Sequence, residues 1–171
     1  PYPANRHNID VFGRSAAGSG ATTFLLETRH RKVEPTAYAE TREQALEVGA
    51  GLTTLGIRPG DKVAILSEGC NAWIISELGL FYAGAISVPL SVKLEESNDL
   101  LFRLRHAEVK ALFVSKYQLP KIRRIRHALP PLVHNILFGH LPLHTADTHL
   151  APPQRLTLEY RATNPMQFTP T

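Results

Sequence analysis

The sequence predicts an α/β protein with a doubly wound, mainly parallel sheet flanked by helices. Short apolar runs recur along the chain, at residues 63–66, 86–88, 111–114 and 133–137. Segments of helical periodicity separate these runs, and glycine and proline turns mark their ends. The run at 63–66 is apolar at every position, which is typical of a strand covered on both faces, and helical crossovers between the runs favour parallel neighbours.

The N-terminal part is expected to hold loose chain, a hairpin and a long helix. Residues Pro1–Gly20 show little periodicity and are predicted to be extended or loose. Residues 22–28 have strand character, and Arg29–Lys32 would form the turn of a hairpin that returns through Val33. A helix is predicted from Thr36 or Tyr38 to Leu55, ended by Gly56, with one buried stripe formed by Ala45, Val48, Leu52 and Leu55.

The central part continues this alternation. A helix is expected over Trp73–Ala83, after which Ile86, Val88 and Leu90 would resume a strand, with Pro89 marking its exit. Ser97 is the expected N-cap of the next helix, with Asp99 in its first turn and a core face of Leu100, Leu101, Leu104 and Ala107. The last helix would bury Leu119, Ile122, Ile125 and Leu129, with Pro120 in its first turn.

These elements divide the chain into three parts. We expect an irregular N-terminal segment with a hairpin (residues 1–35), an α/β core (36–139) and an irregular connection (140–171). Several prolines and threonines interrupt the pattern beyond Gly139, although Thr157–Tyr160 could add a short edge strand.

Composition is that of a globular protein of one domain. The 171 residues are 43% hydrophobic and 20% charged, and no apolar run reaches the ~18–20 residues of a membrane span. A single cysteine, Cys70, excludes an internal disulfide framework and fits a reducing compartment, so we expect a cytoplasmic protein. The net charge of +4 would suit nucleic acid, an anionic membrane surface, or nucleotide and CoA phosphates.

The run from Gly56 to Leu90 carries a family resemblance. It contains G-I-R-P-G-D-K-V-A-I at 56–65, Trp73 at a helix start and Y-A-G-A-I-S-V-P-L at 82–90. Upstream stands Tyr38-Ala39-Glu40, and downstream H-A-E-V-K-A-L-F-V-S at 106–115. The order and spacing of these pieces resemble the adenylate-forming acyl-CoA synthetases and ligases, also called AMP-binding enzymes, from about Tyr38 to Pro130.

The chain departs from this family in small details and in one large one. Thr41 stands where Leu is usual, Ala72 where Glu precedes the Trp, and Gly69 where Asn is common. The large departure is the lack of the family's S-G-T-T-G-x-P-K-G loop, whose backbone N–H groups cradle ATP phosphates. The final residues, Met166–Thr171, resemble those that lead into that loop, which would put Thr171 at its edge. We therefore expect an N-terminal piece of a longer enzyme.

The resemblance implies an ATP-dependent carboxylate–CoA ligase. The full-length protein would use ATP and Mg²⁺ to convert a carboxylic acid, for example a fatty acid, into an acyl-adenylate, and would then pass the acyl group to CoA. It could form a homodimer. This piece would be a scaffold that holds neither ATP nor catalytic residues. Related alternatives are an amino-acid adenylation domain and a luciferase-like enzyme; an alternative of another class is a non-catalytic α/β module that binds a nucleotide or a partner protein.

Two clusters of ionisable side chains, one of histidines and one of basic residues, are expected to be exposed to solvent rather than to form functional sites. His140, His144 and His149 would not share one helix face, and no cysteine completes a zinc site, so we expect exposed loop histidines and no metal. A basic cluster occupies the last helix, at Lys121, Arg123, Arg124, Arg126 and His127. Without interleaved aromatic residues it predicts a solvated helix face rather than a nucleic-acid site.

The remaining candidates also favour structural roles. Cys70 lies before a helix, where its thiol could be activated, but no base is recognisable in the sequence. Trp73 and Tyr82 could line a pocket, and packing of the helix on the sheet explains them as well. Gly79 and Gly84 are expected to allow close approach of helix and strand rather than phosphate contact, since their spacing does not form G-x-G-x-x-G.

Overall fold

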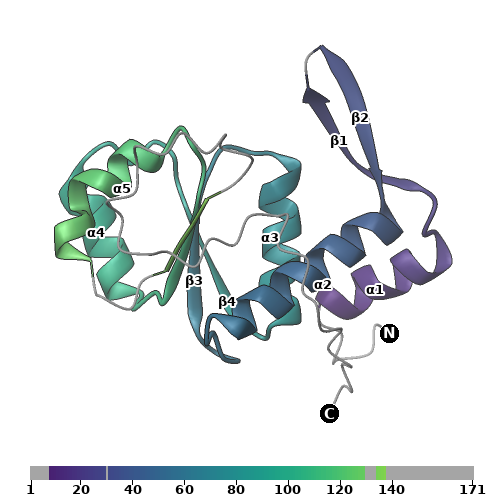
Figure 1. The fold of residues 1–171 in the computed structure, drawn as a ribbon, viewed down its shortest axis with the longest axis horizontal. Helices are drawn as coiled ribbons and strands as arrows, with labels where there is room; N and C mark the ends of the chain where they lie inside the picture. Colours follow the sequence, from purple (N-terminus) through teal and green to yellow (C-terminus); the bar gives the residue numbers. More distant parts are fainter. Residues whose placement is uncertain (1–7, 30, 130–133, 138–171) are drawn as a thin grey trace, which may run out of the picture.

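The computed structural model describes residues 8–29, 31–129 and 134–137 (Figure 1). In chain order its elements are α1 (Asn8–Gly18), β1 (Thr23–Arg29), β2 (Lys32–Ala37), α2 (Tyr38–Thr54), β3 (Lys62–Leu66), α3 (Asn71–Tyr82), β4 (Ile86–Leu90), α4 (Ser97–His106), β5 (Ala111–Val114), α5 (Leu119–Ile125), a 3₁₀ turn (Arg126–Ala128) and β6 (His134–Leu137).

The central sheet is parallel, with its strands in the order β4-β3-β5-β6. Strand β3 pairs on one side with β4, where Val63 lies opposite Ser87, and on the other with β5, where Val63 lies opposite Ala111. The predicted parallel sheet is thus confirmed for all four apolar runs, apart from Val133, which lies outside the described residues.

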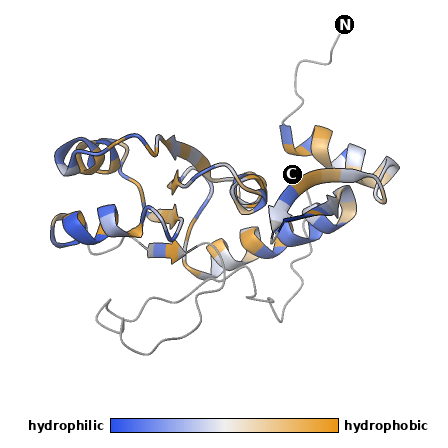
Figure 2. Cartoon of the chain, turned by 90° about the horizontal axis from the view of Figure 1, so that it is seen from above, coloured by the Kyte–Doolittle hydropathy of each residue, from blue (hydrophilic) through white to orange (hydrophobic). Residues whose placement is uncertain are grey.

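Helices cover both faces of this sheet, which makes the fold doubly wound. Alternate residues of β3 point to opposite sides: Val63 and Ile65 join α2 and α3 in one core, while Ala64 and Leu66 join α4 and α5 in another. Because both faces are covered, every residue of β5 is buried. The strands are among the more hydrophobic parts of the ribbon in Figure 2.

Pro89 is the last residue but one of β4, which runs on to Leu90 as the sequence predicts. It stands opposite Ile65 of β3. Strand β4 is at the edge of the described sheet, where a missing N–H group can face away from the neighbouring strand without breaking the ladder.

The N-terminal region is more ordered than the sequence predicts. Residues 8–18, expected to be loose chain, form helix α1, whereas Pro1–His7 lie outside the described residues. Phe12 of α1 is buried, and its ring centroid lies 5.2 Å from that of Phe24 on β1. Phe24 in turn lies 4.4 Å from Tyr38 at the start of α2. This aromatic cluster holds α1 beside the root of the hairpin.

The predicted hairpin is confirmed as the antiparallel pair β1–β2, which projects away from the parallel sheet (Figure 1). The predicted long helix is confirmed as α2, and Gly56 after it has a φ of +82°, a conformation that favours glycine. Of its predicted stripe, Ala45 and Leu52 are fully buried, and Val48 and Leu55 pack against the same core.

The two glycines at the end of α3 act differently from our expectation. A Cβ at Gly79 would lie 2.6 Å from Val48 Cγ1 and 3.0 Å from the Ala45 carbonyl oxygen, so this glycine allows helix α2, not a strand, to approach α3. Gly84 has a φ of +68°, and a Cβ there would meet Pro59. It therefore serves the turn before β4.

The remaining differences between the predicted and the observed structure lie at the ends of helices α4 and α5. Ser97 is the first residue of α4 and Glu96 precedes it as N-cap, without a side-chain capping bond. The predicted core face of α4 is confirmed, with Leu100 and Leu104 buried and Leu101 and Ala107 packed against them. Helix α5 ends at Ile125, and Leu129 follows the 3₁₀ turn with an extended backbone.

Two further observations concern the described part of the chain. None of its helices has the length and apolar character needed to cross a bilayer. The expected edge strand at Thr157–Tyr160 falls outside it.

Candidate functional site at the carboxyl edge of the sheet

The strand order changes direction between β3 and β5. From β3 the chain crosses to β4 on one side and then returns to β5 on the other. In open α/β sheets, ligands bind outside the carboxyl ends of the strands at such a switch point. The residues that follow β3 and β5 therefore form the candidate site.

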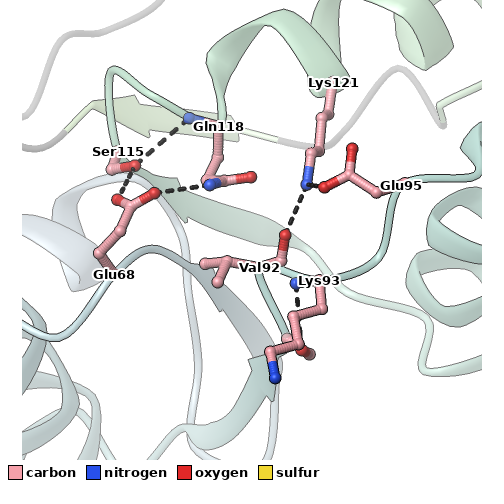
Figure 3. A network of polar contacts seen from close by, with 8 residues as sticks. Glu68, Val92, Lys93, Glu95, Ser115, Gln118 and Lys121 are labelled. Atoms are coloured by element: carbon pink, nitrogen blue, oxygen red, sulfur yellow. Dashed lines mark hydrogen bonds and ion pairs between the residues drawn. The ribbon is translucent and has the colours of Figure 1, made fainter.

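A carboxylate lies at this switch point. Glu68 follows β3, and its Oε2 accepts a hydrogen bond of 2.6 Å from the hydroxyl of Ser115, which follows β5. Its Oε1 accepts a second bond of 2.6 Å from Nε2 of Gln118. Ser115 Oγ also accepts a bond from the Gln118 backbone N–H (Figure 3). These contacts tie the ends of two adjacent strands together.

The surroundings of Glu68 favour its ionised form. Partial burial by itself raises the pKa of the carboxyl group, because it removes water from the charge. The hydrogen bonds from Ser115 and Gln118 outweigh that effect, and the positive charge of Lys121 adds to them. The net result is a pKa below its ordinary value, so Glu68 is a carboxylate at neutral pH.

A second contact crosses the same edge from α5 to the loop after β4. Lys121 Nζ donates to the Val92 carbonyl oxygen at 2.6 Å and to Glu95 Oε1 at 2.9 Å. The lysine side chain is only 14% exposed, whereas that of Glu95 is 74% exposed. The ammonium is therefore held mainly by the protein rather than by water. Since β4 and β5 lie on opposite sides of β3, this contact spans the end of the central strand.

The arrangement suits a structural junction better than a phosphate site. The ionised carboxylate of Glu68 at the switch point repels phosphate. The nearby donors, the Ser115 hydroxyl and the Gln118 side-chain amide, are already directed at Glu68. The junction formed by Glu68, Ser115 and Gln118 thus does not fit the phosphates of ATP. No group of three or more His, Cys, Asp or Glu side chains in the described ranges could hold a metal ion.

Cys70 lies beside this junction as the N-cap of α3. Its thiol is half-buried, and its sulfur lies 4.0 Å from Ser67 Oγ. The next residue, Asn71, donates its backbone N–H to Glu27 Oε1 of the hairpin at 3.3 Å. A carboxylate at a helix N-terminus is favourably placed, so Glu27 links the hairpin to α3.

Trp73 and Tyr82 both take part in packing. Trp73 is partly buried against the core formed by α2, α3 and the sheet. Tyr82 contacts α2, where a Cβ built on Gly49 would lie 3.2 Å from the Tyr82 Cβ. Burial raises the pKa of the Tyr82 hydroxyl, and the nearby guanidinium of Arg42 acts in the opposite direction.

The basic cluster is not uniform. Arg123, Arg124 and His127 are exposed, as a solvated helix face requires, but Lys121 is turned into the contact with Val92 and Glu95. The three histidines 140, 144 and 149 and the predicted loop edge at Thr171 lie outside the described residues.

Sequence reasoning did not identify Glu68, Ser115 or Gln118. A usable signal was present: Ser67 and Glu68 follow one apolar run, and Ser115 follows another. Polar residues at the ends of parallel strands meet at one edge of a sheet. Only the pairing of β3 with β5, however, shows that these two ends are neighbours.

Comparison with known proteins gives the family. Residues 12–165 match the profile of the AMP-binding enzymes. A crotonobetaine/carnitine–CoA ligase of Salmonella agona is 31% identical over 153 residues, which are 87% of this chain and 28% of the relative. An acyl–CoA ligase of Bacillus subtilis is 33% identical over 112 residues, 66% of this chain and 21% of the relative. The chain thus spans less than a third of these proteins.

Solved structures agree with this result. The anthranilate CoA ligase AuaEII, crystallised with anthranoyl-AMP, superposes with a TM-score of 0.73 at 27% identity, over 84% of this chain and 27% of that one. The N-terminal domain of FACL13 from Mycobacterium tuberculosis gives 0.68 at 26% identity, over 76% and 33%. With a family match over most of its length and a parallel, doubly wound sheet, this chain belongs to the family of AMP-binding enzymes.

Proposed function

We propose that this chain supplies the N-terminal part of an ATP-dependent carboxylate–CoA ligase. The observation that supports it most is the match to the AMP-binding enzymes over residues 12–165, to which the likeness to a crotonobetaine/carnitine–CoA ligase adds. The whole enzyme would activate an organic acid with ATP and Mg²⁺ and transfer the acyl group to CoA. Two of the proteins named above are a crotonobetaine/carnitine–CoA ligase and an anthranilate CoA ligase, so we propose a small organic acid or a fatty acid as substrate.

In this proposal the 171 residues are a scaffold without catalytic activity of their own. ATP phosphates require a dense set of hydrogen-bond donors and a metal ion to offset their charge and hydration. At the switch point of this sheet, Glu68 takes up the available side-chain donors instead. The scaffold would hold β3, β4 and β5 in fixed register beneath the remainder of the enzyme.

Carboxylate-dependent exchange of labelled pyrophosphate into ATP tests the proposal directly. The assay compares residues 1–171 with a chain continued past Thr171 by the coding sequence that follows it, each with a panel of fatty, aromatic, short-chain and amino acids. A reaction without acid measures the background. We expect exchange by the longer chain alone.

Each half of the proposal can fail separately. Robust exchange by residues 1–171 would contradict the scaffold role. A folded longer chain that remains silent with every acid would contradict the ligase function and favour the non-catalytic module. Exchange that depends on an amino acid would instead favour an amino-acid adenylation domain.

A further inference from the structure

We propose that the outer side of the α4–α5 layer is a docking surface for an anionic lipid membrane. The side chains concerned, which we call the α4–α5 basic face, are Phe102, Arg103, Arg105, His106, Arg124 and His127. All six are exposed. This inference does not depend on the proposed ligase activity, because the face lies on the opposite side of these helices from the sheet.

The basic face is a fixed part of the fold. Leu100 and Leu104 of α4 and Ile122 and Ile125 of α5 are buried in the same core under the sheet, which turns the remaining side chains outward. The two helices lie side by side (Figure 1). The guanidinium of Arg105 also joins them, since its Nε and Nη2 donate to the Ala128 carbonyl oxygen at 3.2 and 2.6 Å.

Charge is separated along this layer. The basic residues of α4 occupy its last turn, and Arg123 and Arg124 occupy the last turn of α5, whereas Lys121 near its start contacts Glu95. The acidic residues of α4 lie at the other end, where Glu96 precedes the helix and Asp99 stands in its first turn. Of the acids near the basic end, Glu108 is exposed, with its carboxylate 4.0 Å from Lys62. The basic end is therefore strongly cationic.

Helix dipoles explain part of this pattern but not the aromatic residue within it. Cations near a helix C-terminus are stabilised by the dipole. Phe102, however, is 65% exposed, and its ring lies 5.4 Å from that of His106 in a stacked arrangement. At a bilayer interface the cations would meet lipid phosphates, and this exposed ring could enter the headgroup region beside them.

An anionic membrane fits the α4–α5 basic face better than a small anionic ligand or a single-stranded nucleic acid does. Small ligands prefer concave sites, whereas these side chains stand on the outer sides of two helices. Single-stranded nucleic acids use several aromatic rings as stacking platforms, whereas the basic face as defined holds one, that of Phe102. The observations therefore favour a membrane.

Vesicle sedimentation tests the proposal with the 171-residue chain. The vesicles are neutral phosphatidylcholine, or phosphatidylcholine with a third phosphatidylglycerol, at low and at 0.5 M salt. We expect retention by the anionic vesicles alone, with loss in high salt. The double variant Arg103→Gln/Arg124→Gln should bind roughly 25-fold more weakly, about fivefold for each charge. Arg105 is kept because it joins the two helices. Phe102→Ser should weaken retention further.

The matched control removes the same charge elsewhere. Arg14 and Arg31 are exposed on α1 and in the hairpin turn, at the far end of the molecule from α4 and α5. Arg14→Gln/Arg31→Gln should retain wild-type binding. Equal losses in both double variants, equal retention by neutral vesicles, or no retention at all would overturn the proposal. Tighter binding to single-stranded RNA than to anionic vesicles, at equal phosphate concentration, would also overturn it and favour nucleic acid.

Discussion

At the scale of single residues, the Glu68 side chain stabilises the fold by linking the segments that follow β3 and β5. Two hydrogen bonds of 2.6 Å reach its two carboxylate oxygens from residues 47 and 50 positions later in the chain. Bonds to a charged group are stronger than those between neutral groups. Glu68 therefore contributes to the joining of β3 and β5 beyond the pairing of their backbones.

Removing this charge should lower stability in a pH-dependent manner. Glu68→Gln is expected to cost about 1–2 kcal/mol at pH 7, because two charge-assisted bonds weaken. The folded-state pKa lies below the ordinary 4.5, so the stabilisation is fully present above about pH 4.5 and is lost as the pH falls through the folded-state value. Urea unfolding at pH 7 and pH 3 measures both quantities.

The control for this experiment is Glu43→Gln on the exposed side of α2, which should change the free energy of unfolding by less than about 0.5 kcal/mol. A difference between Glu68→Gln and wild type that is as large at pH 3 as at pH 7 would contradict the role of the ionised carboxylate.

Trp73 gives a second prediction. Truncation of a fully buried Trp costs about 3–5 kcal/mol, but Trp73 is only partly buried against its core. We expect Trp73→Ala to cost about 2–3 kcal/mol in thermal or urea unfolding. Phe102→Ala, at an exposed ring, should be nearly neutral. Equal melting curves for wild type and Trp73→Ala would show that the indole contributes no packing and would return it to the candidates for ligand contact.

At the scale of elements, helices α2 and α3 meet through glycine. The Cβ of an alanine at position 79 would lie 2.6 Å from Val48 Cγ1, and a Cβ at Gly49 would lie 3.0 Å from the Gly79 carbonyl oxygen. The helix backbones therefore approach each other at a distance that larger residues do not allow.

Alanine substitutions at two helical glycines should act in opposite directions. Alanine favours a helix over glycine by about 1 kcal/mol. At Gly13 of α1 no atom lies within 4 Å of the added Cβ, so Gly13→Ala should leave stability unchanged or raise it by up to about 1 kcal/mol. At Gly79 the clash should outweigh this gain, for a net loss of about 1–3 kcal/mol. Urea unfolding of both variants measures the contrast, and a stabilised Gly79→Ala would contradict the packing described.

The sequence could predict elements whose signals are local. The all-apolar runs of β3 and β5 and the periodicity of α2 are such signals, and all three elements appear where expected. Helix α1 was missed because Gly13, Ser15 and Gly18 give it little intrinsic helical tendency. Its stability comes from the contacts of Phe12 with Phe24 and Tyr38, which a local pattern does not contain.

At the scale of the whole molecule, two properties position the candidate site, and only the first could be predicted from sequence. Parallel strands with helical crossovers follow from the alternation of apolar runs and helical periods. The order β4-β3-β5-β6 depends on which strand lies beside β3, and no single residue encodes it. This order makes neighbours of Glu68 and Ser115.

The same order bears on the sequence of events in folding. The bond from Lys121 to Val92 joins residues 29 positions apart, and that from Gln118 to Glu68 joins residues 50 apart. Closing such loops costs chain entropy that the two bonds alone do not return, so they form after the sheet has assembled. Interactions made late in folding are absent from the transition state and act on the rate of escape from the native state. The polar junction at the carboxyl edge would thus prolong the lifetime of the folded chain while leaving the speed of its formation almost unchanged.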